Sequence, residues 1–464
     1  MLATPSTRDP DPVLGGSPPA GWRAGTLTYT AGGLALLFAL LLVGDFAWSL
    51  KERGVAPVFQ VELRRQGASD LLVGMFLGAI PSLISILVTP VVGVLSDRAR
   101  TRWGRRIPFL ALPTPLIALG LVGMACTTDL ATHLQPWTPG WERATVILVL
   151  YGVLWTVFEV ATLVANAVFH GLVNDVVPAA LIGRFFGLFR AVSLGAGIIF
   201  NTWIIGHAEE AFRIIILGIA AVYVVGITVM CLFVREGAYP SPPPWPTGGP
   251  RGAVRGYLGQ TLRLGYYRRI FVAVALGAVA FLPVNTFSIF AATSYGLTVE
   301  QYGRWMAGAF VVSLVIAYPM GAMADRLHPL RIGAVALAVY LVALLVSWAL
   351  VDSGTGYGIA FAIHVVISGA FFSATASLGM VLFPRLQFSQ FAAAATIATS
   401  LATMVLSPLA GRILDLTGRD YRLTFLMGAL ITATALVVWI VVWRQFCTLN
   451  GPQGYTPPEP GQLT

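Results

Sequence analysis

The stretch that decides the fold reads GVLSDRARTRWGRRIPF and runs from Gly93 to Phe109. It places one acidic residue, Asp97, and five arginines between two long apolar segments. Basic residues next to an apolar segment are typical of loops on the cytoplasmic side of a membrane. A weaker copy, GAMADRLHPLRIG, begins at Gly321, 228 residues further along. Because this offset is about half of the chain, the sequence predicts two consecutive structural repeats.

The composition is that of a polytopic membrane protein. The 464 residues are 57% hydrophobic and 11% charged, with a mean hydropathy of +0.79, whereas soluble domains carry about 25% charged residues. A spanning helix needs about 20 apolar residues. The windows of that length are 31–62, 70–95, 107–128, 144–176, 184–206, 211–234, 268–293, 301–323, 331–351, 356–384, 389–413 and 422–444. We therefore predict an all-α polytopic membrane protein with twelve transmembrane helices in two six-helix pseudo-repeats.

We expect these windows to form two bundles. The N-terminal bundle covers 29–234 and the C-terminal bundle covers 267–446. A cytoplasmic linker, 235–266, joins them, and its prolines disfavour helix. Residues 1–28 are rich in Pro, Gly, Ser and Thr and are predicted to be a disordered cytoplasmic tail. Residues 447–464 are predicted to be a second cytoplasmic tail.

The arginines predict the orientation. They are concentrated in alternate connections, and cytoplasmic connections are the ones enriched in basic residues, so both termini are expected in the cytoplasm. We expect a multi-pass protein of the cell membrane, which is the inner membrane in a bacterium. This distribution also accounts for the net charge of +9 and the pI of 9.7. We therefore expect the protein to contact the lipid bilayer and not a nucleic acid.

Four charged residues stand inside the first apolar window: Asp45, Lys51, Glu52 and Arg53. One charge near the centre of a spanning helix costs about 3 kcal/mol, so the cluster needs partner charges or a water-filled cavity. Lys51 is the only lysine in the chain, which suggests selection for a compact, titratable ammonium group. The alternatives are that Lys51 snorkels outward or that it neutralises Glu52 structurally.

The amino-acid sequence of residues 93–109 is similar to the signature that the major facilitator superfamily carries between spans two and three. SDR followed by RWGRR and Pro-Phe resembles the glycoside-pentoside-hexuronide transporters and the related sucrose transporters. The resemblance implies two six-helix halves that rock about a central cavity. It also implies conformational gating by both copies of the signature, with the residues Gly93, Asp97, Arg98, Arg105, Arg106, Asp325 and Arg326.

The first span supports the same resemblance. The string WSLKERGVAPVFQ resembles WALQLSLLTPYVQ of sucrose transporters without a gap, with identities at Trp48, Leu50, Pro57 and Gln60. The triplet Lys51-Glu52-Arg53 stands where that family has Gln-Leu-Ser. The aromatic residues Trp48, Trp155 and Phe59 are expected either to stack on a sugar ring or to pack in the core.

The fourth window carries a polar stripe. Glu159, Asn166 and His170 are spaced seven and four residues apart and share one helix face, and the resemblance places polar and charged residues at the same intervals. Glu159 lies near mid-membrane, where acids mark proton relays. The alternatives are an interhelical hydrogen bond for Asn166 and a neutral core position for His170.

The resemblance also implies a functional arginine in the fifth span. Both Arg184 and Arg190 are available, and Arg190 lies deeper. Its alternative role is a structural ion pair with Asp175 or Glu159. We expect substrate binding and coupling at Asp45, Trp48, Lys51, Glu52, Arg53, Glu159, Asn166, His170 and Arg190.

The coupling ion is predicted to be a proton. In the resembled family, the sodium-coupled members similar to melibiose carriers have two carboxylates in the second span, and the corresponding positions here are Ser85 and Thr89. Hydroxyl groups alone bind Na⁺ poorly. Asp45, Glu52 and Glu159 remain as proton sites. No other cofactor and no metal is expected. The predicted function is a secondary active transporter, a proton-coupled symporter of a sugar or glycoside.

Two further readings stay open. The Lys51-Glu52-Arg53 triplet could select an anionic small molecule, such as a uronate or an organic acid, through charge pairing, and the direction could be export. Alternatively the chain is a non-transporting receptor or assembly factor whose charges are structural. An enzyme is not indicated, because the sequence has no nucleophile and base pair, metal-ligand spacing or phosphate-binding loop.

Overall fold

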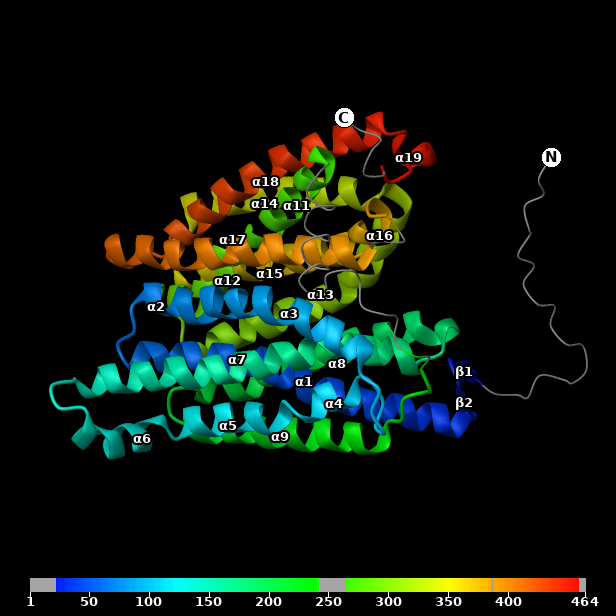
Figure 1. Cartoon of the computed structure of the whole chain (residues 1–464). Coiled ribbons are helices and arrows are strands. Elements are labelled where there is room, and N and C mark those ends of the chain that lie inside the picture. The colour runs from blue at the N-terminus through cyan, green and yellow to red at the C-terminus, as the bar shows by residue number, and fades with distance from the viewer. Residues whose placement is uncertain (1–21, 240, 242–263, 385–387, 459–464) are drawn as a thin grey trace, which may run out of the picture.

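The computed structural model describes residues 22–239, 241, 264–384 and 388–458. Among them, 12 helices are long and apolar enough to cross a membrane, and they coincide with the predicted windows. The prediction of an all-α polytopic fold is therefore confirmed. Figure 1 shows the helices of the first half as one bundle and those of the second half as another beside it.

The N-terminal half contains spans one to six. Side-chain caps define where the first helices begin, because the hydroxyl of Thr30 accepts a hydrogen bond from the Gly33 amide and that of Ser69 accepts one from the Leu72 amide. The helices are α1 (Ala31–Arg65), α2 (Asp70–Gly74), η1 (Met75–Ala79), α3 (Ile80–Arg98), α4 (Ile107–Ala111), α5 (Thr114–Ala125), α6 (Thr127–Leu134), η2 (Gln135–Trp137), α7 (Arg143–Val176), η3 (Ala179–Leu181), α8 (Ile182–Ile199), η4 (Phe200–Ile204), η5 (Ile205–His207) and α9 (Phe212–Phe233).

The C-terminal half contains spans seven to twelve. Thr298 and Gln301 form a reciprocal capping box at the start of the eighth span. The helices are α11 (Gly265–Val279), α12 (Leu282–Ser294), α13 (Val299–Leu327), α14 (Pro329–Leu350), α15 (Gly354–Thr375), α16 (Leu378–Leu382), α17 (Phe388–Leu416), α18 (Leu423–Thr448) and α19 (Gly451–Gly454).

The two halves meet mainly along two helix pairs. The second span (α2, η1 and α3) packs against α17, and the fifth span (α8, η4 and η5) packs against α13. The contact is tight near the connections 66–69 and 417–422, where a Cβ on Gly74 or Gly411 would collide with the backbone of the opposite half. We call this end of the molecule the closed end.

The same spans separate at their other end, near the connection 99–106. A Cβ added at Gly93 of α3 or at Gly321 of α13 would meet nothing within 4 Å. We call this end the open end. The two halves therefore pack less closely at the open end than at the closed end.

The terminal segments differ from the prediction. Residues 22–28, predicted to belong to a disordered tail, form most of a hairpin of β1 (Trp22–Ala24) and β2 (Leu27–Tyr29), so that part of the prediction is wrong. Residues 1–21 and most of the predicted linker lie outside the described residues. The C-terminal segment packs on the bundle, where the Tyr267 hydroxyl donates to the Pro458 carbonyl at 2.9 Å.

Candidate functional site

A cavity of about 190 Å³ lies between α1 and α7 in the N-terminal half. Both helices place polar and aromatic side chains on its wall, as the predicted stripes on the first and fourth spans require. Its lining consists of Trp48, Lys51, Glu52, Val55, Ala56, Trp155, Phe158, Glu159, Thr162, Leu163 and Asn166. Five residues predicted for substrate binding and coupling therefore come together here: Trp48, Lys51, Glu52, Glu159 and Asn166.

Lys51 is buried, with 1% of its surface exposed. Its ammonium nitrogen lies 3.8 Å from the centre of the Trp48 ring, with the rings of Tyr223 and Phe158 at 5.4 and 5.7 Å. Aromatic faces attract a desolvated cation. The alternative that Lys51 snorkels outward is wrong, and within the described residues no carboxylate lies within 4.0 Å of its nitrogen.

The three aromatic residues proposed to stack on a sugar lie in the core in this state. Trp48 stacks on Phe169 at 5.3 Å between ring centres, and 4% of it is exposed. Phe59 and Trp155 stack on each other at 4.6 Å. Trp48 and Trp155 still contribute to the cavity wall.

Two of the other charges of the first span, Asp45 and Arg53, lie outside the cavity lining. Asp45 is fully buried, and its carboxylate accepts a hydrogen bond from the Ser49 hydroxyl at 3.2 Å. Arg53 donates to the Ser193 hydroxyl at 3.1 Å, and its guanidinium lies 4.9 Å from the centre of the Phe310 ring of α13. Arg53 therefore bridges the two halves. Glu52 is exposed beside Glu159 on the cavity wall.

His170 and Arg190 are exposed residues outside the cavity lining. His170 lies 5.9 Å from the Phe189 ring, between ring centres, so the alternative of a buried core position is wrong. The ion pair between Arg190 and Asp175 is also not formed, because Asp175 binds the signature arginines instead.

The signature residues form a network inside the N-terminal half. Arg106 pairs with Asp97 at 2.6 Å and with Asp175 at 3.3 Å. Arg105 donates to Asp175 twice, at 2.7 and 3.0 Å, which is the bidentate geometry of a strong ion pair. Gly93 faces open space, and Arg98 and Arg326 lie at the same end of the molecule. The side chain of Asp325 lies outside the described residues.

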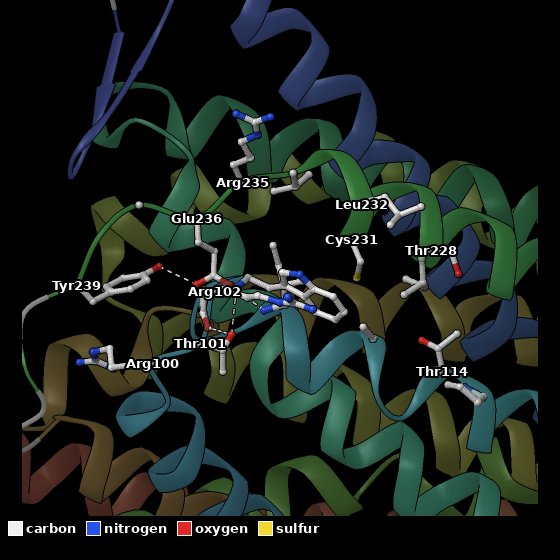
Figure 2. A pocket seen from close by; sticks show the side chains of 18 of the residues that line it. Arg100, Thr101, Arg102, Thr114, Thr228, Cys231, Leu232, Arg235, Glu236 and Tyr239 are labelled. Atoms are coloured by element: carbon white, nitrogen blue, oxygen red, sulfur yellow. Dashed lines mark hydrogen bonds between the residues drawn. The ribbon is translucent and has the colours of Figure 1, made fainter.

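Glu236 joins this network from the segment after α9, and no pattern in the sequence indicated a role for it. Its carboxylate accepts hydrogen bonds from the backbone amides of Arg105, Arg106 and Ile107, at 2.7 to 3.0 Å. It therefore caps the start of the third span. Figure 2 shows the Tyr239 hydroxyl directed at Glu236, to which it donates at 2.9 Å. Burial, and then the Glu236 charge, raise the pKa of Tyr239.

A second network holds the closed end together, and it too was not indicated by any sequence pattern. The Asp415 carboxylate of α17 accepts hydrogen bonds from the backbone amides of Asp70 and Leu71, both at 2.9 Å. It thus caps α2 from the opposite half. Tyr421 donates to the buried Asp70 carboxylate at 3.0 Å, and Arg64 donates to the Tyr421 hydroxyl at 2.6 Å.

The fold and this arrangement of sites define a secondary transporter with the major facilitator fold. The chain matches the family described as MFS/sugar transport protein over residues 64–387, and it belongs to that family. It is a membrane transporter and not an enzyme. The recognition of a major facilitator protein from the signature is therefore confirmed.

Individual relatives add detail. The chain is 28% identical over 143 residues to a general alpha-glucoside permease of Schizosaccharomyces pombe, a match that spans 31% of this chain and 24% of that permease. It is similar in structure to a D-xylose–proton symporter, with a TM-score of 0.65, 11% identity, and coverage of 93% of this chain and 100% of that one. It is also similar to a bacterial homolog of the human lysosomal transporter Spinster in an inward-facing unoccupied conformation. That match has a TM-score of 0.63 and 14% identity, and it covers 92% of this chain and 98% of that one. At these identities the structures show the fold alone.

Proposed function

We propose that the chain is a proton-coupled symporter that carries a neutral sugar or glycoside by alternating access. The observation that carries this proposal is the cavity between α1 and α7, whose wall combines the carboxylates of Glu52 and Glu159 with the amide of Asn166 and two indole rings. Membership in the sugar-transport family and the match to an alpha-glucoside permease support the class of cargo.

The proposed proton carrier is Glu159, with Asp45 as the second carboxylate available to the cycle. Glu159 shares its cavity with the ammonium group of Lys51. When Glu159 is ionised, its charge and that of Lys51 attract each other across the cavity. When Glu159 takes a proton, this attraction is lost, and Lys51 interacts with the aromatic rings that surround it in this structure. The two protonation states would favour different arrangements of α1 and α7.

The side chains of the second span favour a proton over sodium as the coupling ion. Ser85 and Thr89 lie 3.5 Å apart, oxygen to oxygen, and carry neutral hydroxyl groups. Sodium prefers at least one charged oxygen ligand. The proposal therefore assigns coupling to the carboxylates of the N-terminal half, with both chain ends in the cytoplasm as the arginine distribution favours.

The test measures pH in lightly buffered cells that express the protein. Maltose, trehalose and sucrose are added first, followed by glucuronate and galacturonate. Alkalinisation with a neutral sugar supports the proposal. Alkalinisation with a uronate alone would instead support transport of an anionic cargo. Arg53 and Arg190, which lie near the middle of their spans, could then pair with its charge. Silence across the panel, with the protein present in the membrane, would contradict import and favour export or a non-transporting role.

A further inference from the structure

The seventh span is broken near its middle. α11 ends at Val279 and α12 begins at Leu282, with Pro283 in the first turn of α12. Proline lacks the amide hydrogen that would continue the hydrogen-bond ladder of the helix. Asn285 lies one turn beyond the break. Discontinuous helices in transporters place polar groups at the centre of the membrane.

Asn285 faces an internal space and not the lipid. From Pro283 to Ala292, a stretch that the structure describes completely, it is the one exposed residue, and most of its neighbours are buried. Because the neighbouring residues of α12 are buried, this part of the helix packs against protein and does not contact lipid. The adjacent residue, Thr286, accepts a hydrogen bond through its carbonyl from the Gln60 amide of α1 at 3.2 Å. Asn285 therefore opens into the space between the halves.

A hydrogen-bonded chain behind Asn285 fixes the orientation of its amide. The Oδ1 atom of Asn285 lies 2.9 Å from His364 Nε2, and His364 Nδ1 lies 2.7 Å from the Tyr340 hydroxyl. An amide oxygen only accepts hydrogen bonds. Nε2 must therefore carry the imidazole proton, Nδ1 must accept, and Tyr340 must donate.

The members of this chain are held rigidly. His364 and Tyr340 are 2% and 0% exposed. Phe361 stacks on His364 at 5.9 Å, and Phe281 stacks on Tyr340 at 4.4 Å, between ring centres. With its oxygen engaged by His364, the Asn285 amide can present only its NH₂ group to the space between the halves. Within the described residues that group has no protein acceptor.

We propose that Asn285 is a cargo-binding residue of the C-terminal half, whose NH₂ group donates a hydrogen bond to a hydroxyl or ring oxygen of a neutral sugar. This inference rests on the proposed function. His364 and Tyr340 are positioning residues that act through Asn285. The division of labour follows from the chemistry, because the charged N-terminal half carries the proton site while a neutral amide binds an uncharged oxygen without competing for the proton.

The experiment measures uptake kinetics with the neutral sugar that gives the largest alkalinisation in the wild type. Asn285→Ala should raise KM by about three- to tenfold, the effect of losing one neutral hydrogen bond, and should change the maximal rate less than twofold. Thr432→Ala is the matched control, since it removes a buried hydrogen bond within α18 of the same half. Its KM should equal that of the wild type.

Variants of His364 separate positioning from packing. Gln can reproduce both bonds, since its NH₂ group donates to Asn285 and its oxygen accepts from Tyr340, so His364→Gln should keep the wild-type KM. Leu fills a similar volume but makes neither bond, so His364→Leu should raise KM as Asn285→Ala does. Equal KM values for the Gln and Leu variants would overturn the positioning role.

A second measurement, the accessibility of position 285 to a thiol reagent, tests the inference even if one of the other variants fails to fold. In a background lacking Cys126, Cys231 and Cys447, Asn285→Cys should react with a small charged thiol reagent, and the sugar should slow the reaction. Phe287→Cys, at a buried position, is the unreactive control. A wild type that transports sugar, together with an unchanged KM in Asn285→Ala or an unreactive Asn285→Cys, overturns this inference alone. A wild type that transports no sugar overturns the proposed function and this inference with it.

Discussion

The closed end makes the sharpest prediction, because one carboxylate there binds the opposite half through backbone amides. Asp415→Asn keeps the size of the side chain but replaces one acceptor oxygen by an NH₂ group that faces an amide donor of α2. A hydrogen bond to a charged group contributes about 1.5–3 kcal/mol, and a neutral one about 1 kcal/mol. Two charged bonds would be replaced by one neutral bond. With a discount for the half-buried position, the closed end should lose about 2 kcal/mol, or a factor of roughly 30 in the open fraction.

The assay follows a cysteine at Ser407, a fully buried residue beside Gly74 at the interface of the halves. In a background without the native cysteines, its reaction with a small polar thiol reagent reports how often the closed end opens. Asp415→Asn should accelerate the reaction roughly 30-fold. Asp420→Asn is the control, since the one hydrogen bond that its carboxylate accepts within the described part of the chain is local and comes from the Arg422 amide. Equal rates for the two variants would refute the capping argument.

Three further predictions concern the proton site and the open end. Glu159→Gln should abolish proton-driven accumulation of sugar while sparing exchange, measured against Glu142→Gln as a surface control, and retained accumulation would rule out Glu159 as the carrier. Gly104→Ala should lower the free energy of unfolding by about 2 kcal/mol or more, measured by thermal melting, since Gly104 has a φ of 108° and an added Cβ would collide with the Glu236 carboxylate. Burial lowers the pKa of His328 from 6.5 to about 4, with a further contribution from Arg331. The unfolded state therefore binds more protons, and stability should fall as the pH drops from 6.5 towards 4. His328→Asn should flatten this part of the melting profile, and an unchanged profile would contradict it.

The fold was readable from the sequence because membrane spans are set by local composition. A run of about 20 apolar residues must satisfy its own backbone hydrogen bonds, so it forms a helix whatever its neighbours do. The break in the seventh span is the exception. Pro283 follows the break directly, and a proline in the middle of an apolar window is a signal that could have predicted it.

The site was partly readable. The cost of intramembrane charge drew attention to Lys51, and the structure surrounds its ammonium group with aromatic faces, with no carboxylate within ion-pair distance among the described residues. Trp48, three residues earlier on the same helix face, was the available signal. The role of Glu236 was not predictable in this way, since its partners lie about 130 residues away in sequence and no local pattern encodes that pairing.

The caps at the two ends differ in a way that explains which end is open. At the closed end, Asp415 of one half caps a helix of the other, so separating the halves there would leave two amides of α2 without their acceptor. At the open end, Glu236 caps the third span from within the same half, and the Arg105–Asp175 pair is also internal. These bonds survive whether the halves approach or separate. Within the described ranges, the helix cap that joins the two halves therefore lies at the closed end. In the proposed transport cycle, the free energy to open this end would come from cargo and proton binding between the halves.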